Sequence, residues 1–287
     1  MARYRKSKSS RRNSGLSLGG IILIAAIILV GIGAYRIYAN QKGETAPQSA
    51  GNVHSTGDLT YVVTNPAVKQ YPVEYTGMSV NFNPELHIPN WAAWELTDRE
   101  TRGGVQREQK FYCDESVPGC AETWDYSYSG YDRGHIVPAG DMKWSADAMH
   151  STFSLVNICP QVHSLNAGAW KKLEEKCRKW AQIDGNIIII SGPVLNPAPT
   201  EFIGDTRVAV PKSFFKVILS PNANPVRGIG FIMPNGKVAG GMQAAACSID
   251  RVEELTGHNF FSALPDDVEK EVEQQCDFHF WSTHKKL

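Results

Sequence analysis

The chain has 287 residues, of which 42% are hydrophobic and 20% charged, and its formal net charge at pH 7 is zero. This is an ordinary globular composition with enough length for a substantial core, which excludes a largely disordered protein as the default interpretation. Residues 1–40 hold seven Lys and Arg and no acid, so 22 basic and 29 acidic residues, a net charge of −7, remain for residues 41–287. A polyanion would therefore have to bind a local basic patch.

The N-terminal segment predicts a membrane anchor. Residues 21–30 are all apolar, and no charge occurs between Arg12 and Arg36, a gap about long enough to cross a bilayer as a helix. Most of the basic residues precede this segment, so the positive-inside rule predicts a single-pass membrane protein with a cytoplasmic N-terminus and an extracytoplasmic body. A cleaved signal peptide, which would give a secreted protein, is the alternative. We expect a basic tail and transmembrane helix over residues 1–40 and a flexible linker over residues 41–60.

Residues 61–287 predict one α+β domain. Its first part favours short strands, because apolar and aromatic residues are interrupted by Pro and Gly. Hydrophobic periodicity then predicts helices over residues 145–152 and 165–183, the second ending near Gly185, and strands over residues 153–158, 186–190, 212–220 and 226–233.

Capping and turn residues predict the end of the chain. The pair Asn235-Gly236, before Lys237-Val238, is a hairpin turn signal. Ser248 is the expected N-cap of a helix that stops at Gly257, and a last helix follows Pro265.

Six cysteines, an even number, permit disulfides if the domain faces an oxidising space. Cys113 and Cys120 are close enough in sequence to close a small loop, and we expect these two to pair. The other four are equally compatible with buried free thiols. No Cys or His spacing typical of a zinc site occurs.

Three blocks in fixed order carry the chemistry: Gly130–His135 (GYDRGH), Asn157–Gln161 (NICPQ) and Leu165–Glu174 (LNAGAWKKLE). A histidine beside Arg and Gly is by itself usually structural, but three blocks together are far more specific.

Asn166 and Glu174 are spaced so that they fall near one face of a helix, about 12 Å apart along its axis. Asn166 would give one oxygen to Mg²⁺, which keeps most of its waters, and Glu174 would reach those waters. The same spacing is also that of an amphipathic helix packed on a core, and the two interpretations are compatible. Several lysines in this segment offer contacts to phosphates, although a solvated face explains any one of them equally well.

These blocks resemble the DNA/RNA non-specific endonuclease family, the ββα-metal nucleases that include mitochondrial endonuclease G. The resemblance extends over roughly residues 71–280. It implies a His-Me finger fold with a central, mainly antiparallel sheet flanked by helices, here preceded by the N-terminal transmembrane helix.

The resemblance also implies the site residues. His135 would be the general base and Asn166 the metal ligand, with Asn157 orienting the histidine. Arg133 would stabilise phosphate charge, and Glu174 would hold metal-bound water. An upstream arginine is also expected at the phosphate. Arg107 is the nearest candidate, with Arg102 and Lys110 close by in the sequence.

The predicted function is hydrolysis of DNA and RNA phosphodiester bonds without strong sequence specificity, giving 5′-phosphate products. A neutral histidine removes a proton from water, and Mg²⁺, with Mn²⁺ as a substitute, offsets charge on the leaving 3′ oxygen. A catalytically silent, membrane-tethered nucleic-acid-binding protein of the same fold is one alternative, and an enzyme acting on a smaller phosphoester is another. The sequence leaves open whether the protein forms a homodimer, and it suggests no other protein partner.

Overall fold

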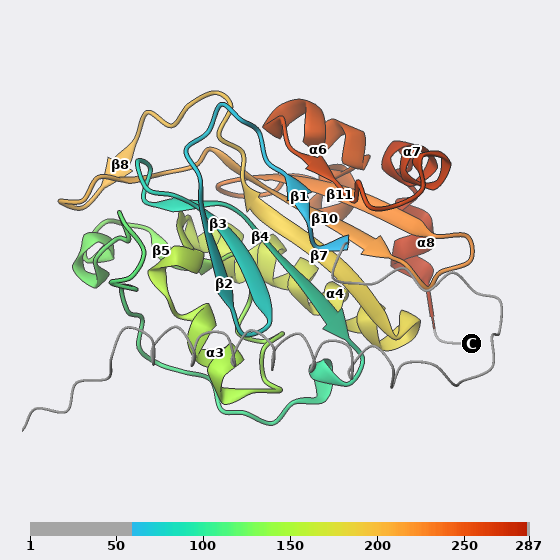
Figure 1. Cartoon of the computed structure of the whole chain (residues 1–287), viewed down its shortest axis with the longest axis horizontal. Helices are drawn as coiled ribbons and strands as arrows, with labels where there is room; N and C mark the ends of the chain where they lie inside the picture. The colour runs from blue at the N-terminus through green and yellow to red at the C-terminus, as the bar shows by residue number, and fades with distance from the viewer. Residues whose placement is uncertain (1–58, 286–287) are drawn as a thin grey trace, which may run out of the picture. The chain divides into compact units, whose positions relative to one another are not determined.

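A seven-stranded antiparallel sheet forms the centre of the computed structural model, which describes residues 59–285 (Figure 1). Its strands follow the order β12-β11-β10-β7-β4-β3-β2, and all neighbours are antiparallel. The α+β class and the central antiparallel sheet are therefore as predicted. The strands are β2 (Tyr71–Tyr75), β3 (Met78–Asn83), β4 (Ile88–Thr97), β7 (Asn186–Pro193), β10 (Ser213–Ser220), β11 (Arg227–Pro234) and β12 (Ala246–Cys247).

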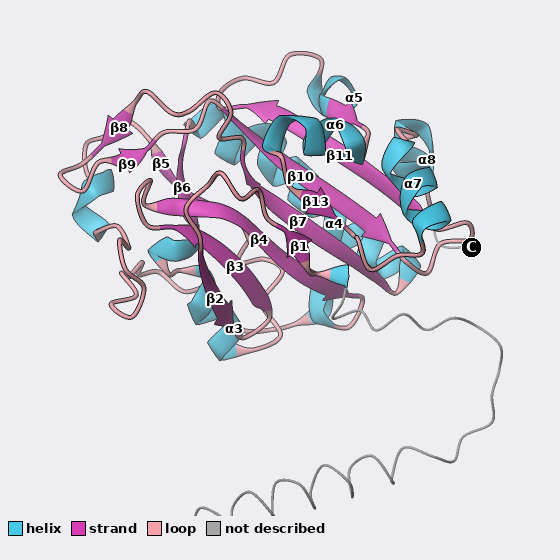
Figure 2. Cartoon of the chain, turned by 45° about the horizontal axis from the view of Figure 1, so that its top comes forward, coloured by secondary structure: helices cyan, strands magenta, loops and turns pink. Residues whose placement is uncertain are grey.

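The two faces of this sheet bury two different hydrophobic clusters. Successive side chains of a strand point to opposite faces, so Ile187 and Ile189 join one cluster while Ile188 and Ile190 join the other. The first cluster includes residues of α4 (Lys171–Asp184) and the second includes residues of α6 (Ile249–Thr256) and α7 (Asp266–Gln274). Figure 2 shows α6 and α7 in front of the sheet, with α4 behind it. Helices thus cover both faces of the sheet.

A separate two-stranded ribbon lies on the α4 side of the fold. It pairs β5 (Asp132–His135) with β6 (Ile158–Gln161) in antiparallel register, and α4 follows in the chain. This is the ββα order that the resemblance implies. The remaining strands and α-helices are β1 (Val62–Val63), β8 (Phe202–Ile203), β9 (Val208–Ala209), β13 (Asn259–Phe260), α3 (Ala146–Thr152), α5 (Gly241–Ala245) and α8 (Phe278–Thr283).

Capping residues begin and end the helices where the sequence predicts. Ser145 Oγ accepts from Ala148 N at the start of α3, and Ser248 Oγ accepts from Arg251 N at the start of α6. Gly257 ends α6 in the left-handed region, with φ 70°. The predicted cap at Ser248 and stop at Gly257 are confirmed because each depends on contacts within one helical turn.

The helix predicted over residues 165–183 is not continuous. Its first part, Leu165–Trp170, is a π-helical turn whose backbone departs from helical values at Gly168, and α4 starts only at Lys171. The regular spacing assumed for Asn166 and Glu174 therefore does not hold, because the backbone breaks between them.

Two strand predictions also need correction. The strand expected over residues 153–158 is replaced by a 3₁₀ turn at Leu155–Asn157, and β6 starts only at Ile158. The Ser154 hydroxyl caps this turn by accepting from Val156 N. The pair Asn235-Gly236 makes no hairpin to a following strand, since β11 pairs with β12 ten residues later. The Asn235 side chain is instead bonded across the fold, accepting from Val162 N and donating to Pro160 O and Pro211 O.

The predicted disulfide is wrong in this structure. All six cysteines lie within the described residues and all are free. Asp114 N donates to Cys120 Sγ at 3.3 Å, and burial raises the thiol pKa values of Cys113 and Cys120. Both side chains therefore remain neutral thiols.

The predicted basic tail, the anchor and nearly all of the linker lie outside the described residues, and the domain boundaries stay predictions. Within residues 59–285 there is no helix with the length and apolar character of a membrane span.

Candidate active site

His135 ends β5 and is packed under aromatic rings. Its ring centroid lies 4.9 Å from that of Phe153 and 5.3 Å from that of Phe111, and the residue is 8% exposed. Nε2 is buried and has no hydrogen-bond partner. Burial, helped by the positive charge of Arg107, lowers the pKa of His135 to about 3. The imidazole is therefore neutral at physiological pH, as a general base must be.

Asn157 holds the backbone that follows His135 rather than the ring itself. Its Oδ1 accepts from Val137 N at 2.9 Å, and its Nδ2 donates to Val137 O and to Thr152 O, both at 3.0 Å. The Asn157 carbonyl also accepts from Ile136 N. Because Asn157 is fully buried, this network fixes the path of the chain on leaving β5.

Asn166 lies in the π-helical turn, and the NH₂ group of its side-chain amide is hydrogen-bonded. Its Nδ2 donates to Asp132 Oδ2 at 2.9 Å, and the same carboxylate oxygen bonds His163 Nδ1 at 2.8 Å. Within the described residues no hydrogen bond reaches Asn166 Oδ1. The hydrogen bond to Asp132 orients the Asn166 amide and leaves its Oδ1 available to a ligand.

A cleft of about 350 Å³ brings four of the six predicted site residues together. They are His135, Asn166, Glu174 and Arg107, and Lys171 and Arg178 add further positive charge. Burial raises the pKa of Glu174 to about 7, an effect that the nearby Lys216 opposes. The cleft therefore combines a neutral imidazole, an amide oxygen, a carboxylate and several cations.

Arg133 does not line this cleft. Its Nη2 donates to Thr123 O at 2.6 Å, and its guanidinium lies 5.5 Å from the ring centroids of both Phe111 and Tyr126. Its Nε is buried without a partner. Among the three upstream candidates, Arg107 alone lines the cleft, whereas Arg102 pairs with Asp98 at 2.7 Å.

A buried charge network below the cleft was not foreseen. Lys216 on β10 is fully buried, its Nζ has no hydrogen-bond partner, and it lies 4.8 Å from the Trp94 ring and 4.6 Å from the Trp170 ring. Asp141, also fully buried, bonds Arg178 at 2.7 Å and Trp94 Nε1 at 3.1 Å. A lysine inside the apolar run FFKVIL is unusual enough to have signalled the network, because buried lysines are rare without partners.

The model of the DNA/RNA non-specific endonucleases matches residues 55–267 of the chain. The chain belongs to this family. Mitochondrial nuclease EXOG of Xenopus laevis is 30% identical over 278 residues, covering 91% of the chain and 76% of that protein. Human mitochondrial endonuclease G is 35% identical over 170 residues, covering 55% of the chain and 57% of that protein. A solved structure titled as the EndoG/EndoGI complex aligns with a TM-score of 0.66 and 25% identity, over 75% of the chain and 95% of the matched one.

The comparisons overturn the predicted localisation as a single-pass membrane protein with an extracytoplasmic nuclease domain. These relatives of the endonuclease family are named mitochondrial nucleases, which conflicts with that prediction. The prediction depended on basic residues followed by an apolar run. That pattern is not specific to anchors, because N-terminal targeting segments are also basic.

Proposed function

We propose that this endonuclease hydrolyses phosphodiester bonds of DNA and RNA without strong sequence preference, depends on Mg²⁺, and leaves 5′-phosphate products. The observation that supports this most is the meeting of His135, Asn166 and Glu174 in one cleft. These residues come from a strand, a π-helical turn and a helix. Among the described elements we find no module that would contact base edges, and backbone chemistry needs none.

The oxygen donors in the cleft fit a hard divalent cation. Asn166 Oδ1 has no partner in the described residues, and the Glu174 carboxylate lines the same cleft. Mg²⁺ binds oxygen, keeps several waters and needs only one or two protein ligands, so Asn166 would hold it directly and Glu174 through water. Mn²⁺ accepts similar ligands. When bound, the ion supplies positive charge that offsets the charge on the phosphoryl and leaving 3′ oxygens.

His135 would take a proton from the water whose oxygen attacks phosphorus. The P–O3′ bond breaks as the new P–O bond forms, so the phosphate stays on the 5′ side. The 3′ oxygen leaves as a hydroxyl after taking a proton from solvent, to which His135 later releases the proton that it removed. A pKa of about 3 makes free His135 a weak base. A substrate phosphate in the cleft would raise this pKa, because negative charge favours the protonated imidazole. The base therefore gains strength when substrate is bound.

The remaining residues would bind and position the substrate. Arg107 and Lys171 line the cleft and can donate charge-assisted hydrogen bonds to phosphate oxygens. Arg133 does not line the cleft, and its Nη2 already donates to Thr123 O, so its role at a phosphate is the least supported of the set. Asn157 would orient His135 through the backbone.

The test is cleavage of supercoiled plasmid and of RNA by the full chain, with Mg²⁺, with Mn²⁺ and with EDTA. We expect metal-dependent cleavage that His135→Ala lowers by about 100-fold or more, whereas Asn166→Ala raises the Mg²⁺ concentration needed for half-maximal rate. His279→Ala, at an exposed histidine on α8, is the matched control and should cleave like the wild type.

Each alternative gives a different result. A folded protein that binds DNA but cuts neither polymer would support a catalytically silent binding protein. Cleavage confined to small phosphoesters would support another substrate class. Full turnover by His135→Ala would remove the histidine from the mechanism, and an unchanged Mg²⁺ titration in Asn166→Ala would remove that ligand.

A further inference from the structure

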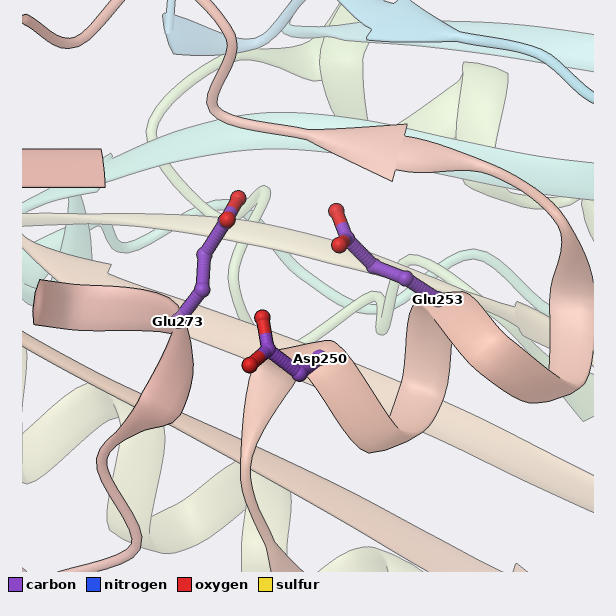
Figure 3. Close-up of side chains that lie close together, drawn as sticks. All are labelled: Asp250, Glu253 and Glu273. Carbon is purple, nitrogen blue, oxygen red and sulfur yellow. The ribbon is translucent and has the colours of Figure 1, made fainter. Parts of the chain in front are cut away.

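Three carboxylates converge on the face of the sheet opposite the cleft. Asp250 and Glu253 lie one turn apart on α6, and Glu273 lies near the end of α7. Each offers a carboxylate oxygen, and these oxygens all lie within 4.8 Å of one another. Figure 3 shows the three side chains turned toward a common space between the two helices. Like charges brought this close need a compensating group.

The protein itself supplies no such group within the described residues. Glu273 is only 8% exposed, and its Oε1 is buried with no hydrogen-bond partner. Glu253 Oε1 accepts one hydrogen bond, from Phe260 N at 2.8 Å. None of the three carboxylates forms an ion pair with a described basic residue, and Arg251, on the same helix as Asp250 and Glu253, pairs with Glu254 instead. An unpartnered buried carboxylate oxygen is costly and points to a missing ligand.

The elements that carry the carboxylates are firmly packed. At Gly228 of β11 an added Cβ would lie 2.6 Å from the Val272 side chain of α7 and 2.7 Å from the Ile249 side chain of α6, so any larger residue would force these side chains to shift. Val272 and Ile249 adjoin Glu273 and Asp250 in sequence. The acidic side chains therefore start from backbone positions that the core already fixes.

We propose that Asp250, Glu253 and Glu273 bind a divalent cation, Ca²⁺ in preference to others, that clamps α6 to α7. Two oxygens bound to one Ca²⁺ at about 2.3–2.6 Å can lie up to about 5 Å apart, which matches the separation of these oxygens. An all-carboxylate set without His or Cys favours hard cations over Zn²⁺ or Cu²⁺. The three ligands leave room for the additional oxygens, including water, that Ca²⁺ needs.

Shared protons are the competing way to neutralise this cluster. Without a cation, burial together with the neighbouring carboxylates raises the pKa of Glu273 to about 8, and burial raises that of Glu253 to about 7. A protonated cluster would be indifferent to calcium, whereas a cation site would not.

The experiment uses the full chain carrying Asn166→Ala, which removes the proposed metal ligand of the cleft. Thermal unfolding is measured with and without Ca²⁺, and calcium binding is measured by titration calorimetry. At about ten times its Kd, Ca²⁺ should raise Tm by about 3–6 °C over EDTA, and calorimetry should detect one ion. Adding Glu273→Gln should abolish both signals, with Asp250→Asn as a second variant should the first fail to fold. Glu271→Gln, an exposed glutamate on the same helix, should keep them.

Two results would overturn the proposal. An unchanged Tm and no heat in the parent protein would mean that the cluster holds protons. A calcium shift that survives both Glu273→Gln and Asp250→Asn would place the ion elsewhere. Neither result bears on the nuclease proposal, because no step of this experiment measures cleavage.

Discussion

Lowering the pH from 7 to 5 should destabilise this protein through His135, and His135→Gln should remove that part of the loss. Burial holds the pKa of His135 near 3 in the folded chain, against about 6.5 when unfolded. Between pH 3 and pH 6.5 His135 is therefore protonated in the unfolded chain but neutral in the folded chain. The free energy of unfolding therefore falls as the pH drops below about 6.5 and stops falling near pH 3.

The size of the effect follows from the two pKa values. Each pH unit below the unfolded pKa costs about 1.4 kcal/mol, so pH 5 costs about 2 kcal/mol relative to pH 7. His258, whose pKa burial lowers to about 4, adds a similar amount in both wild type and variant. The difference between the two proteins isolates His135.

Urea unfolding in EDTA at pH 7 and at pH 5 measures both free energies. We expect the pH-dependent loss to be about 2 kcal/mol smaller in His135→Gln than in the wild type, and unchanged in the exposed control His279→Ala. Equal losses in wild type and His135→Gln would refute the reasoning, because they would mean that His135 titrates normally in the folded protein.

Two further predictions concern residues that support the cleft. Asn157→Ala should lower the free energy of unfolding by about 3 kcal/mol, since it leaves buried backbone groups at Val137 and Thr152 without partners. Urea unfolding measures this, Asn259→Ala on the exposed side of β13 is the control, and a loss below about 1 kcal/mol would contradict it. Lys216→Met should slow cleavage by about 10- to 100-fold while Tm holds or rises, because an apolar side chain replaces a buried ammonium that forms no hydrogen bond. Plasmid cleavage and thermal unfolding test this beside the exposed Lys212→Met, and an unchanged rate would count against a role for Lys216.

Local signals in the sequence predicted local structure well. Ser248 and Gly257 mark helix ends correctly because capping depends on residues within one turn. The β-branched, apolar run at residues 186–190 predicted a buried strand, and it lies in β7, all of whose residues are buried. The class of fold follows from these elements.

Contacts between distant parts of the chain could not be predicted in the same way. Asn235 looks like a hairpin residue, yet its side chain bonds Val162, Pro160 and Pro211 from other elements. The π-helical turn before α4 was missed because the periodicity of residues 165–183 fits one straight helix. Arg133, next to the histidine motif, packs on two aromatic rings rather than facing the cleft.

The sequence still placed His135, Asn166, Glu174 and Arg107 in one site, and all four line one cleft. That expectation came from the resemblance of the three motifs to the endonuclease family, with Arg107 as the nearest of three upstream candidates. The sequence could not indicate the buried charges below the cleft, since Asp141, Arg178 and Lys216 meet only after the sheet and α4 have packed.

The position of Lys216 also constrains how the sheet can assemble. On β10, Lys216 points toward α4, whereas its neighbours Phe215 and Val217 point into the apolar layer under α6. A slip of one residue against β7 would exchange these faces, placing the ammonium among hydrocarbon side chains and far from Glu174. Such a misregistered sheet would lose several kcal/mol. One buried amine thereby discriminates against alternative pairings of the adjacent strands β7 and β10.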